Sequence, residues 1–305
     1  MNIFLTGASG YIGGNIAARL VAEGHGVRGL VRDRAKAELL RARGIAPVLG
    51  NLEDEQILAN EARRADGVIN TANADDRRCV EALIGALEGS GKPLIHTSGS
   101  SVIGDDARGG SVNEAVFDED TPFVVAPAKL ARHALNQSVQ SAASRGVRSI
   151  VVCPTLIYGV GQGLNRHSIQ IPFLVSEARA QGVARVVGEG VNRWSTVHID
   201  DLTDLYLLAL HHAPGGAFYF AENGEVSFAA IGSAIAERLG LSGVESIPAE
   251  DAARLWGTTR AFYTFGSNSR VIARRARREL GWNPRHDSAL TWIREEMPIE
   301  NEEHP

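Results

Sequence analysis

The sequence predicts an α/β protein in which a doubly wound parallel sheet is followed by a smaller C-terminal α/β lobe. Two observations support this fold class. Short apolar segments alternate with helix-like segments over residues 1–155, and the chain opens with an apolar strand that runs directly into a glycine-rich turn. Strands separated by helices and short loops form parallel sheets that helices cover on both faces.

The opening turn contains Gly7, Gly10 and Gly13, and residues 15–23 after it are predicted to form a helix. In a dinucleotide-binding βαβ unit, the first glycine permits the tight turn and the second lets backbone N–H groups approach a pyrophosphate. The third lets the helix pack closely on the strand. The helix N-terminus offers N–H donors and partial positive charge to phosphate. The turn therefore predicts a bound dinucleotide.

The later elements continue the alternation. Further strands are expected at residues 27–31, 47–49, 67–70, 93–97 and 149–153, and helices at residues 171–181 and 228–239. Residues 104–122, rich in Gly, Asp and Glu, are expected to form a mobile loop near the ligand crevice. The expected nucleotide domain spans residues 1–155 and about 197–213, and the expected substrate lobe spans residues 156–196 and 214–305.

Two charged runs are interpreted as solvated surface. The arginine-rich residues 274–278 are expected on a helix that ends near Gly281. A frayed acidic tail is expected to carry Glu295, Glu296, Glu300, Glu302 and Glu303.

The composition argues against several functions. The 305-residue chain carries 31 Lys and Arg against 36 Asp and Glu, and its net charge of -5 gives no general attraction to nucleic acid or to an anionic membrane. No apolar run approaches the roughly 20 residues of a membrane span, and the opening strand lacks the features of a signal peptide, so a cytoplasmic protein is expected. Cys79 and Cys153 are too few for a disulfide framework or a cysteine metal site, and no metal is expected.

Four more segments accompany the glycine turn in the order typical of one family. They are Gly-Asn-Leu-Glu at residues 50–53, Pro-Thr-Leu-Ile-Tyr-Gly at 154–159, Val-His-Ile-Asp-Asp-Leu at 197–202 and Leu-Gly-Trp-Asn-Pro at 280–284. Together these residues resemble the extended short-chain dehydrogenase/reductase superfamily, of the NAD-dependent epimerase/dehydratase type. The resemblance spans nearly the whole chain and implies a Rossmann nucleotide domain in an NAD(P)-dependent oxidoreductase or epimerase-like enzyme.

The resemblance also implies where the dinucleotide lies. The residues expected to contact it are Gly7, Ser9, Gly10, Tyr11, Ile12, Gly13, Arg32, Asn51, Leu52, Thr71, Ala72, Asn73, Thr97, Lys129 and Pro154. Selection of NAD usually needs an acidic side chain at the end of the second strand, where it accepts the ribose hydroxyls. Here Arg32 stands at that end and suits a 2′-phosphate, with Lys36 nearby. NADP(H) is therefore the expected cofactor, and Asp33 leaves NAD(H) as the alternative.

The catalytic residues depart from the family pattern. The resemblance implies a Tyr four residues before a Lys, with the phenol as proton donor, and a Ser or Thr five residues before the glycine that follows strand five. Here Val125 stands four residues before Lys129, and counting back from Gly104 reaches Gly99. Neither Val nor Gly has an ionisable group, so neither can act as a general acid.

Four residues are candidates for the missing chemistry. Lys129 is expected to orient the nicotinamide ribose or to donate the proton, and the alternative is an ordinary exposed helix lysine. Ser98 and Ser100 flank the missing hydroxyl position, and Tyr158 is the phenol that faces the crevice by analogy. Structural roles remain the alternative for the serines, as capping hydroxyls, and for Tyr158, as a packed core residue.

On the substrate side, the family often places an Arg just before the return strand, where a guanidinium binds a diphosphate. Alignment through His198 places Trp194 there. This exchange favours a small, partly aromatic or apolar carbonyl-type substrate over a sugar nucleotide. Trp194, Gln170 and Asn165 are the candidate substrate residues. His198 is expected to be structural, and the two aspartates after it to cap the next helix.

A homodimer is expected through the helices at about residues 77–88 and 126–143, which the family commonly pairs into a four-helix bundle. Apolar stripes mark both helices, with Val80, Leu83, Ile84 and Leu87 on the first and Leu130, Ala134 and Leu135 on the second. The alternative is that both stripes pack only on the monomer's own sheet.

Three functions remain open. The leading expectation is an NAD(P)H-dependent oxidoreductase of atypical extended short-chain dehydrogenase type that acts on a small organic carbonyl-type substrate. The second is a non-catalytic dinucleotide sensor similar to the NmrA-type regulators. The third is an epimerase or dehydratase whose acid and base groups have moved.

Overall fold

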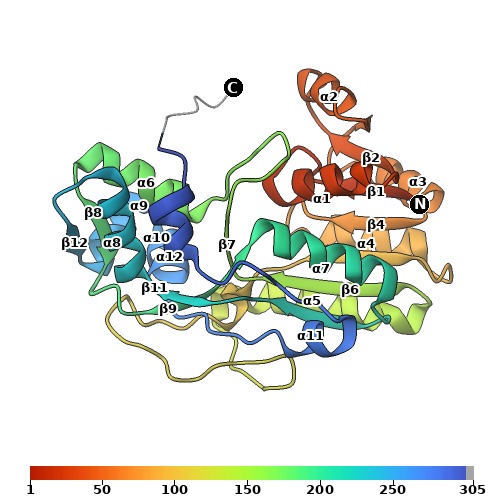
Figure 1. Cartoon of the computed structure of the whole chain (residues 1–305). Coiled ribbons are helices and arrows are strands. Elements are labelled where there is room, and N and C mark those ends of the chain that lie inside the picture. Colours follow the sequence, from red (N-terminus) through yellow and green to blue (C-terminus); the bar gives the residue numbers. More distant parts are fainter. Residues whose placement is uncertain (300–305) are drawn as a thin grey trace.

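A seven-stranded sheet forms the centre of the structure, which is a computed structural model describing residues 1–299. The strand order is β10-β6-β5-β4-β1-β2-β3, and every neighbouring pair is parallel. Figure 1 shows this sheet on one side of the molecule and a smaller, mainly helical lobe on the other. The predicted doubly wound α/β class is confirmed.

The central sheet contains β1 (Asn2–Thr6), β2 (Gly26–Val31), β3 (Ile45–Leu49), β4 (Gly67–Asn70), β5 (Pro93–Thr97), β6 (Arg148–Pro154) and β10 (Ala217–Ala221). On one face pack α1 (Tyr11–Ala22), α2 (Arg34–Arg41), α7 (Ile199–His212) and α11 (Arg274–Leu280). On the other face pack α3 (Glu55–Arg64), α4 (Arg77–Leu87) and α5 (Leu130–Ser141). The first helix begins at Tyr11, four residues before the predicted start, because its N-cap is Gly10 within the turn.

Strand β10 extends the central sheet beyond the expected domain boundary. It pairs in parallel with β6, and its Tyr219 and Phe220 are fully buried. The expected substrate lobe included all of residues 214–305, whereas this strand belongs to the central sheet. The chain returns to the sheet because these apolar side chains complete the core beside β6.

The second lobe has its own core around two small sheets. One contains β7 (Leu156–Tyr158), β9 (Arg193–His198) and β11 (Glu225–Ser227), and the other contains β8 (Ala184–Val187) and β12 (Val244–Ile247). Its helices are α6 (Gln170–Gln181), α8 (Phe228–Leu239), α9 (Ala249–Trp256), α10 (Thr258–Arg260) and α12 (Ala289–Thr291), with short π-helices at η4 (Ala261–Phe265) and η5 (Trp292–Glu296). Of the expected acidic tail, Glu300, Glu302 and Glu303 lie outside the described residues.

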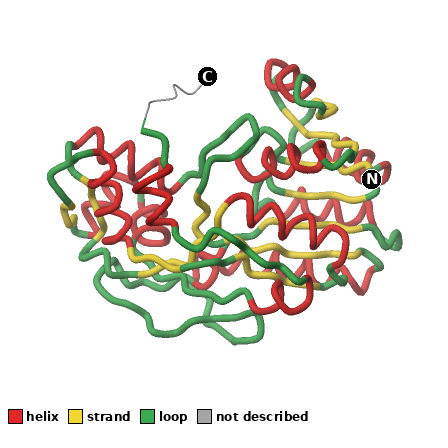
Figure 2. Tube along the Cα trace, in the orientation of Figure 1, coloured by secondary structure: helices red, strands yellow, loops and turns green. Residues whose placement is uncertain are grey.

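Residues 104–122 form a long irregular segment, visible among the loops below the sheet in Figure 2. Asp105 accepts the backbone N–H of Asn268 at 2.8 Å, and Gly109 donates its N–H to the carbonyl of Gly266 at 2.9 Å. Glu119 accepts the backbone N–H of Phe220 at 3.1 Å. These contacts hold the segment against the C-terminal part of the chain. Residues 104–122 are not among those that line the main cavity, although they closely follow Ser101, which does.

The apolar stripes proposed for a dimer face inward. Val80, Leu83, Ile84 and Leu87 of α4 are buried in the core beneath the sheet, and Leu135 of α5 joins them. Most of the residues cited for an interface thus pack on the monomer's own sheet, and only Leu130 and Ala134 are exposed. None of the helices in the described part of the chain combines the length and hydropathy that a membrane-spanning helix requires.

Candidate active site

A cavity of about 1040 Å³ lies at the carboxyl ends of the central strands and extends toward the second lobe. The sheet order reverses between β1 and β4, and ligands of open α/β sheets bind at such a switch point. The cavity is lined by the glycine turn, by residues that follow β2, β3, β4 and β5, and by Lys129 and Arg132 at the start of α5. The fold therefore supplies one continuous site shared by both lobes.

The glycine turn approaches its neighbours too closely for any side chain. Gly7 has φ +78°, and a Cβ there would lie 2.5 Å from Thr71 Oγ1. A Cβ at Gly13 would lie 2.3 Å from the carbonyl oxygen of Gly7. The turn is closed by the Gly10 N–H, which donates to that same carbonyl at 2.8 Å. Glycines at these positions let α1 pack directly on the end of β1.

The N-terminus of α1 is left open to a ligand. Gly10 provides no side-chain cap, and the first turn of the helix carries no acidic residue. Tyr11 donates its hydroxyl to the carbonyl of Gly159 at 2.8 Å, and Asn15 accepts the backbone N–H of Gln162 at 2.7 Å. These bonds fix α1 against the following loop, while its first N–H groups and its positive dipole end suit a phosphate.

All the residues predicted to contact a dinucleotide, with the exception of Thr97, line this cavity. Thr97 is buried, and its hydroxyl lies 2.7 Å from the hydroxyl of Tyr206 in the core. Thr97 therefore lies outside the lining, because its side chain faces α7. The sequence analysis missed further lining residues beside the expected ones, among them Val31, Gly50 and Glu53.

Two neighbouring residues after β2 play different parts. Arg32 is exposed and lines the cavity. Asp33 is the N-cap of α2, and its carboxylate accepts the backbone N–H groups of Ala35 at 2.6 Å and Lys36 at 3.1 Å. The Asp33 carboxylate is thus engaged with its own helix, whereas the Arg32 cation lines the cavity, as does Glu53.

At the inner end of the cavity, Ser98 and Ser100 lie on the lining together with Gly99. The Ser100 hydroxyl accepts a hydrogen bond from the Ser269 hydroxyl at 2.9 Å. Tyr158 lies elsewhere. Its hydroxyl donates to the carbonyl of His286 at 2.9 Å, and burial raises its pKa. Tyr158 is therefore outside the cavity lining, and its hydroxyl is engaged with a backbone carbonyl, which favours the alternative of a packed core residue.

The inner end also holds two cations and a carboxylate. Lys129 is half-buried, and within residues 1–299 its ammonium has no hydrogen-bond or ion-pair partner, the nearest ring being Tyr263 with its centroid 5.7 Å away. Arg132 donates from Nε to Asp75 Oδ1 at 2.7 Å and from Nη2 to Asp75 Oδ2 at 2.5 Å. Burial and the Arg132 cation lower the pKa of Lys129, while Asp75 opposes this shift. The hydrogen bond from Arg132 lowers the pKa of Asp75.

Sequence reasoning missed Arg132 and Asp75. Arg132 stands three residues after Lys129, the spacing of side chains on one helix face, and this was the available signal. Asp75 follows β4, but its pairing with α5 depends on a contact between distant segments.

The substrate side of the cavity is mostly uncharged. Trp194, Gln170 and Asn165 all line it, as do Ser168, Ile169, Thr259 and Thr264, of which the last two come from the region of α10 and η4. Trp194 is buried and donates its indole N–H to the carbonyl of Ser267 at 2.8 Å. The neighbouring Arg193 forms an ion pair with Glu225 at 2.7 Å and does not line the cavity.

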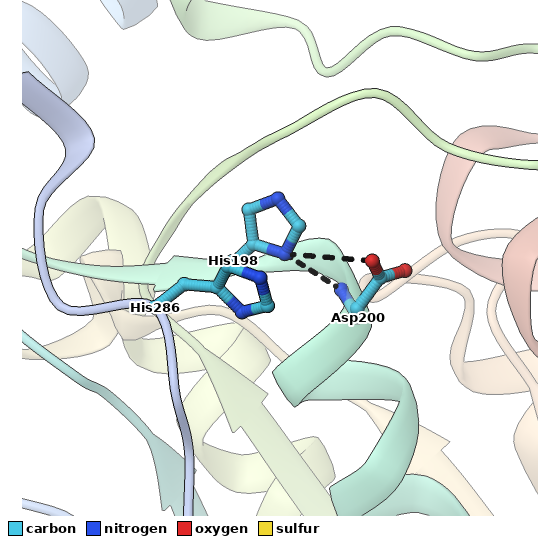
Figure 3. A group of neighbouring side chains, drawn as sticks. All are labelled: His198, Asp200 and His286. Atoms are coloured by element: carbon cyan, nitrogen blue, oxygen red, sulfur yellow. Dashed lines mark hydrogen bonds and ion pairs between the residues drawn. The ribbon is translucent and has the colours of Figure 1, made fainter. Parts of the chain in front are cut away.

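A histidine cluster lies beside the site, at the start of α7. Potential metal-ligand atoms of His198, Asp200 and His286 lie within 4.8 Å of one another (Figure 3). The two imidazole rings stack with their centroids 3.9 Å apart, so their ring-plane lone pairs do not converge. His198 Nδ1 accepts the backbone N–H of Asp200 at 3.2 Å and caps α7, and His286 Nδ1 lies 3.1 Å from Asp201 Oδ2. Contacts within the chain account for the cluster, and the cap is His198 rather than the aspartates.

Comparison with known proteins identifies the family of the chain and relatives that share its fold. The family model described as "NAD dependent epimerase/dehydratase family" matches residues 3–219. The oxidase ucsJ of Acremonium sp is 35% identical over 323 residues, which cover 92% of this chain and 92% of that protein. A 4-hydroxy-2-methyl-3-oxo-4-farnesyl-3,4-dihydroquinoline-1-oxide ketoreductase of Stigmatella aurantiaca is 28% identical over 332 residues, covering 98% of this chain and 97% of that protein.

A solved structure shares the architecture. The dTDP-glucose 4,6-dehydratase of Bacillus anthracis, solved in complex with NAD, superposes with a TM-score of 0.76 at 18% identity, over 97% of this chain and 94% of that chain. The expected resemblance is thus confirmed in both sequence and fold. The chain belongs to the NAD-dependent epimerase/dehydratase family, and it is an oxidoreductase or epimerase-like enzyme that uses a nicotinamide dinucleotide.

Proposed function

We propose that this protein is an NADP(H)-dependent reductase of small organic carbonyl compounds that works without the family's usual Ser and Tyr. The observation that carries the proposal is the inner end of the cavity. There Lys129, whose ammonium has no partner among residues 1–299, lies with serine hydroxyls and Gly99. Val125, at the position of the missing tyrosine, is outside the lining. A site of this kind keeps a cation and a proton source while lacking the phenol.

The residues of the cavity fit a dinucleotide. Gly7 and Gly13 let α1 pack directly on the end of β1, and the N-terminus of α1, which has no side-chain cap, opens on the cavity. Arg32 would hold a 2′-phosphate, because its guanidinium lines the cavity while the carboxylate of Asp33 is occupied as a helix cap. These observations support NADP(H) over NAD(H) as the preferred cofactor.

In the proposed reaction, the cavity would hold a reduced nicotinamide, whose chemistry is the supply of a hydride to the carbonyl carbon. The carbonyl oxygen takes up the π-electron pair and gains a proton from Lys129, directly or through a water that its ammonium holds. Lys129 then recovers a proton from solvent, so the net reaction uses one hydride and one proton. The cavity walls orient the substrate against the cofactor, which is a large part of the work in such reactions.

The substrate is proposed to be uncharged and activated. The residues that the second lobe contributes to the cavity are neutral, and Arg193 is held by Glu225 instead of facing a diphosphate. A carbonyl conjugated to a double bond also suits this site. With such a substrate the hydride would add to the β-carbon instead of the carbonyl carbon, and the resulting enolate would take its proton from solvent more readily than an unassisted alkoxide forms. The similarity to a ketoreductase supports the same reaction class.

The test is a turnover assay of the purified protein with NADPH or NADH and a panel of enones, activated ketones and simple ketones, together with simple secondary alcohols and the oxidised cofactors. We expect modest turnover of enones and activated ketones with NADPH and little turnover of simple secondary alcohols. Tight NADPH binding with no turnover across the panel would support the dinucleotide-sensor alternative. Inversion at a stereocentre or loss of water without net oxidation would identify an epimerase or dehydratase.

Two further proposals come from the sequence alone. A homodimer through α4 and α5 is still proposed. Because most of their apolar side chains pack on the sheet, the interface would be formed by the outer faces of these helices. A cytoplasmic location is proposed as well, and fractionation of the native host would test it.

A further inference from the structure

Arg132 occupies the space beside the missing catalytic hydroxyl. A Cβ added at Gly99 would lie 3.3 Å from Arg132 Nη1. The backbone of Gly99 is extended, with φ -170° and ψ 138°, a conformation that any residue adopts. Glycine is therefore not required here by the backbone, and what its missing side chain provides is room for the guanidinium.

The guanidinium is held in one orientation. Two of its five N–H donors are bound to Asp75, and an Nη1 hydrogen is donated to Ser101 Oγ at 3.2 Å. The Arg132 side chain is only 18% exposed, whereas that of Asp75 is 55% exposed. Asp75 thus fixes the planar group from the solvent side, and the remaining Nη1 hydrogen is available beside Gly99 on the cavity wall.

We propose that Arg132 is a catalytic residue that donates a hydrogen bond to the carbonyl oxygen of the substrate, in place of the serine hydroxyl that Gly99 lacks. The inference rests on the proposed reductase function. Arg132 stays protonated throughout, and it stabilises the negative charge that develops on the oxygen when the carbonyl carbon receives the hydride. The proton of the product comes from Lys129 or a water that it holds.

Asp75 is a positioning residue in this arrangement. Its bidentate contact sets the plane of the guanidinium before the substrate arrives, so the donor needs no reorganisation during the reaction. Asp75 also offsets one of the two cations, which leaves the three charged side chains with a net charge of +1. A neutral carbonyl can therefore enter, and the site interacts most strongly with the oxyanion that forms later.

The first test compares Arg132→Ala with Asp75→Asn in the reductase assay. We expect Arg132→Ala to lower kcat/KM by about 10²–10³-fold, as removal of one oxyanion donor does. Asp75→Asn should also lower kcat/KM, but by a smaller factor than Arg132→Ala. Calorimetric titration of NADPH and the melting temperature report on the fold and the cofactor site, and both should change little in Arg132→Ala. An equal loss of NADPH affinity and of kcat/KM in that variant would overturn the proposal, as would turnover close to that of the parent.

The second test restores the donor. Guanidinium ion, added at concentrations that leave the melting temperature unchanged, should raise the turnover of Arg132→Ala and leave that of Asp75→Asn unaltered. Gly99→Ser should raise turnover only when combined with Arg132→Ala, because in the parent the new side chain would crowd Nη1. If the parent turns over substrate but both restorations fail, the proposed role of Arg132 is overturned while the reductase proposal stands. A parent that turns over no substrate would overturn the reductase proposal and this inference together.

Discussion

Lys129 is the side chain whose protonation state governs the proposed reaction. Its pKa is lowered, first by burial and then by the Arg132 cation, with Asp75 acting in the opposite direction. The neutral amine is therefore populated at a lower pH than in an ordinary lysine, whose pKa is about 10.4. A reductase that takes its proton from this ammonium should lose activity as the pH rises through that lowered pKa.

This dependence is tested with Lys129→Met at saturating NADPH. We expect turnover to fall by about 10²–10⁴-fold, the range for one general acid, and the alkaline decline in the remaining activity to disappear. Lys92→Met is the matched control. The Lys92 ammonium donates to the backbone carbonyl of Arg63, and Lys92 does not line the cavity. An alkaline decline that is unchanged in Lys129→Met would show that another group supplies the proton.

Arg32 is the single residue on which the proposed preference for NADP(H) depends. Arg32→Ala should weaken NADPH binding by roughly 1.5–3 kcal/mol, the contribution of a hydrogen bond to a charged group, and leave NADH binding nearly unchanged. The neighbouring Arg34, the first residue of α2, is a control of equal charge that does not line the cavity. Tighter binding of NADH than of NADPH by the parent protein, measured by calorimetry, would contradict the preference.

At the scale of elements, the contact of α1 with the end of β1 determines the shape of the cofactor cavity. A Cβ at Gly13 would meet the carbonyl oxygen of Gly7 and the hydroxyl of Thr71 at 2.4 Å or less. By contrast, a Cβ at Gly85 in α4 would have no atom within 4 Å. Close packing therefore requires glycine at position 13, whereas Gly85 has only the ordinary destabilising effect of a glycine within a helix.

Substitution by alanine at these two positions should have opposite effects. Gly13→Ala should destabilise the fold by about 1–3 kcal/mol, as overpacking does, and weaken dinucleotide binding because α1 must move from the turn. Gly85→Ala should stabilise it by about 0.5–1 kcal/mol. Urea unfolding of both variants measures these changes. Equal stabilities for the two variants would mean that α1 is not closely packed on β1.

At the scale of the whole molecule, His198 links stability to pH. Its pKa is lowered to about 4, chiefly by burial and then by His286, while Asp200 and Asp201 act against the shift. An unfolded histidine titrates near about 6.5. Between these two values the unfolded chain binds more protons than the folded chain, so stability is lost as the pH falls through this window.

The variant His198→Asn tests this linkage. Asparagine is a good N-cap, so α7 keeps an acceptor without a titrating ring. The melting temperature of the variant should decline less steeply than that of the parent as the pH falls from about 6.5 to about 4. His96, whose pKa burial also lowers to about 4, is present in both proteins and cancels in the comparison. Parallel declines would exclude His198 as a contributor.

Assembly is a second property of the whole molecule. The outer faces of α4 and α5 carry small side chains, with Ala82 and Ala86 half-buried on α4 and Ala131 and Ala134 exposed on α5. If these faces pair, light scattering at micromolar concentration should give twice the mass of the chain, and Ala134→Arg should give the monomer mass. A monomer mass for the parent would refute the dimer.

The sequence by itself determined the order of the elements and the nature of the glycine turn. Both depend on local rules, since apolar segments alternate with helical ones and the turn of Gly7, Gly10 and Gly13 needs residues without a Cβ within a short span of chain. Arg32 followed from the same reasoning, because it stands directly after a strand whose end was recognisable. Positions near the carboxyl ends of parallel strands could therefore be placed in the cavity without a structure.

Only the tertiary structure decided which side chains meet across distant segments. Thr97 and Tyr158 look suitable in the sequence, but packing turns the first toward Tyr206 and binds the second to the carbonyl of His286. Arg132 reaches Gly99 and Asp75 because α5 packs beside the ends of β4 and β5, and strand β10 joins the sheet through its contact with β6. These outcomes depend on side-chain direction and on long-range packing, which no periodicity within one segment encodes.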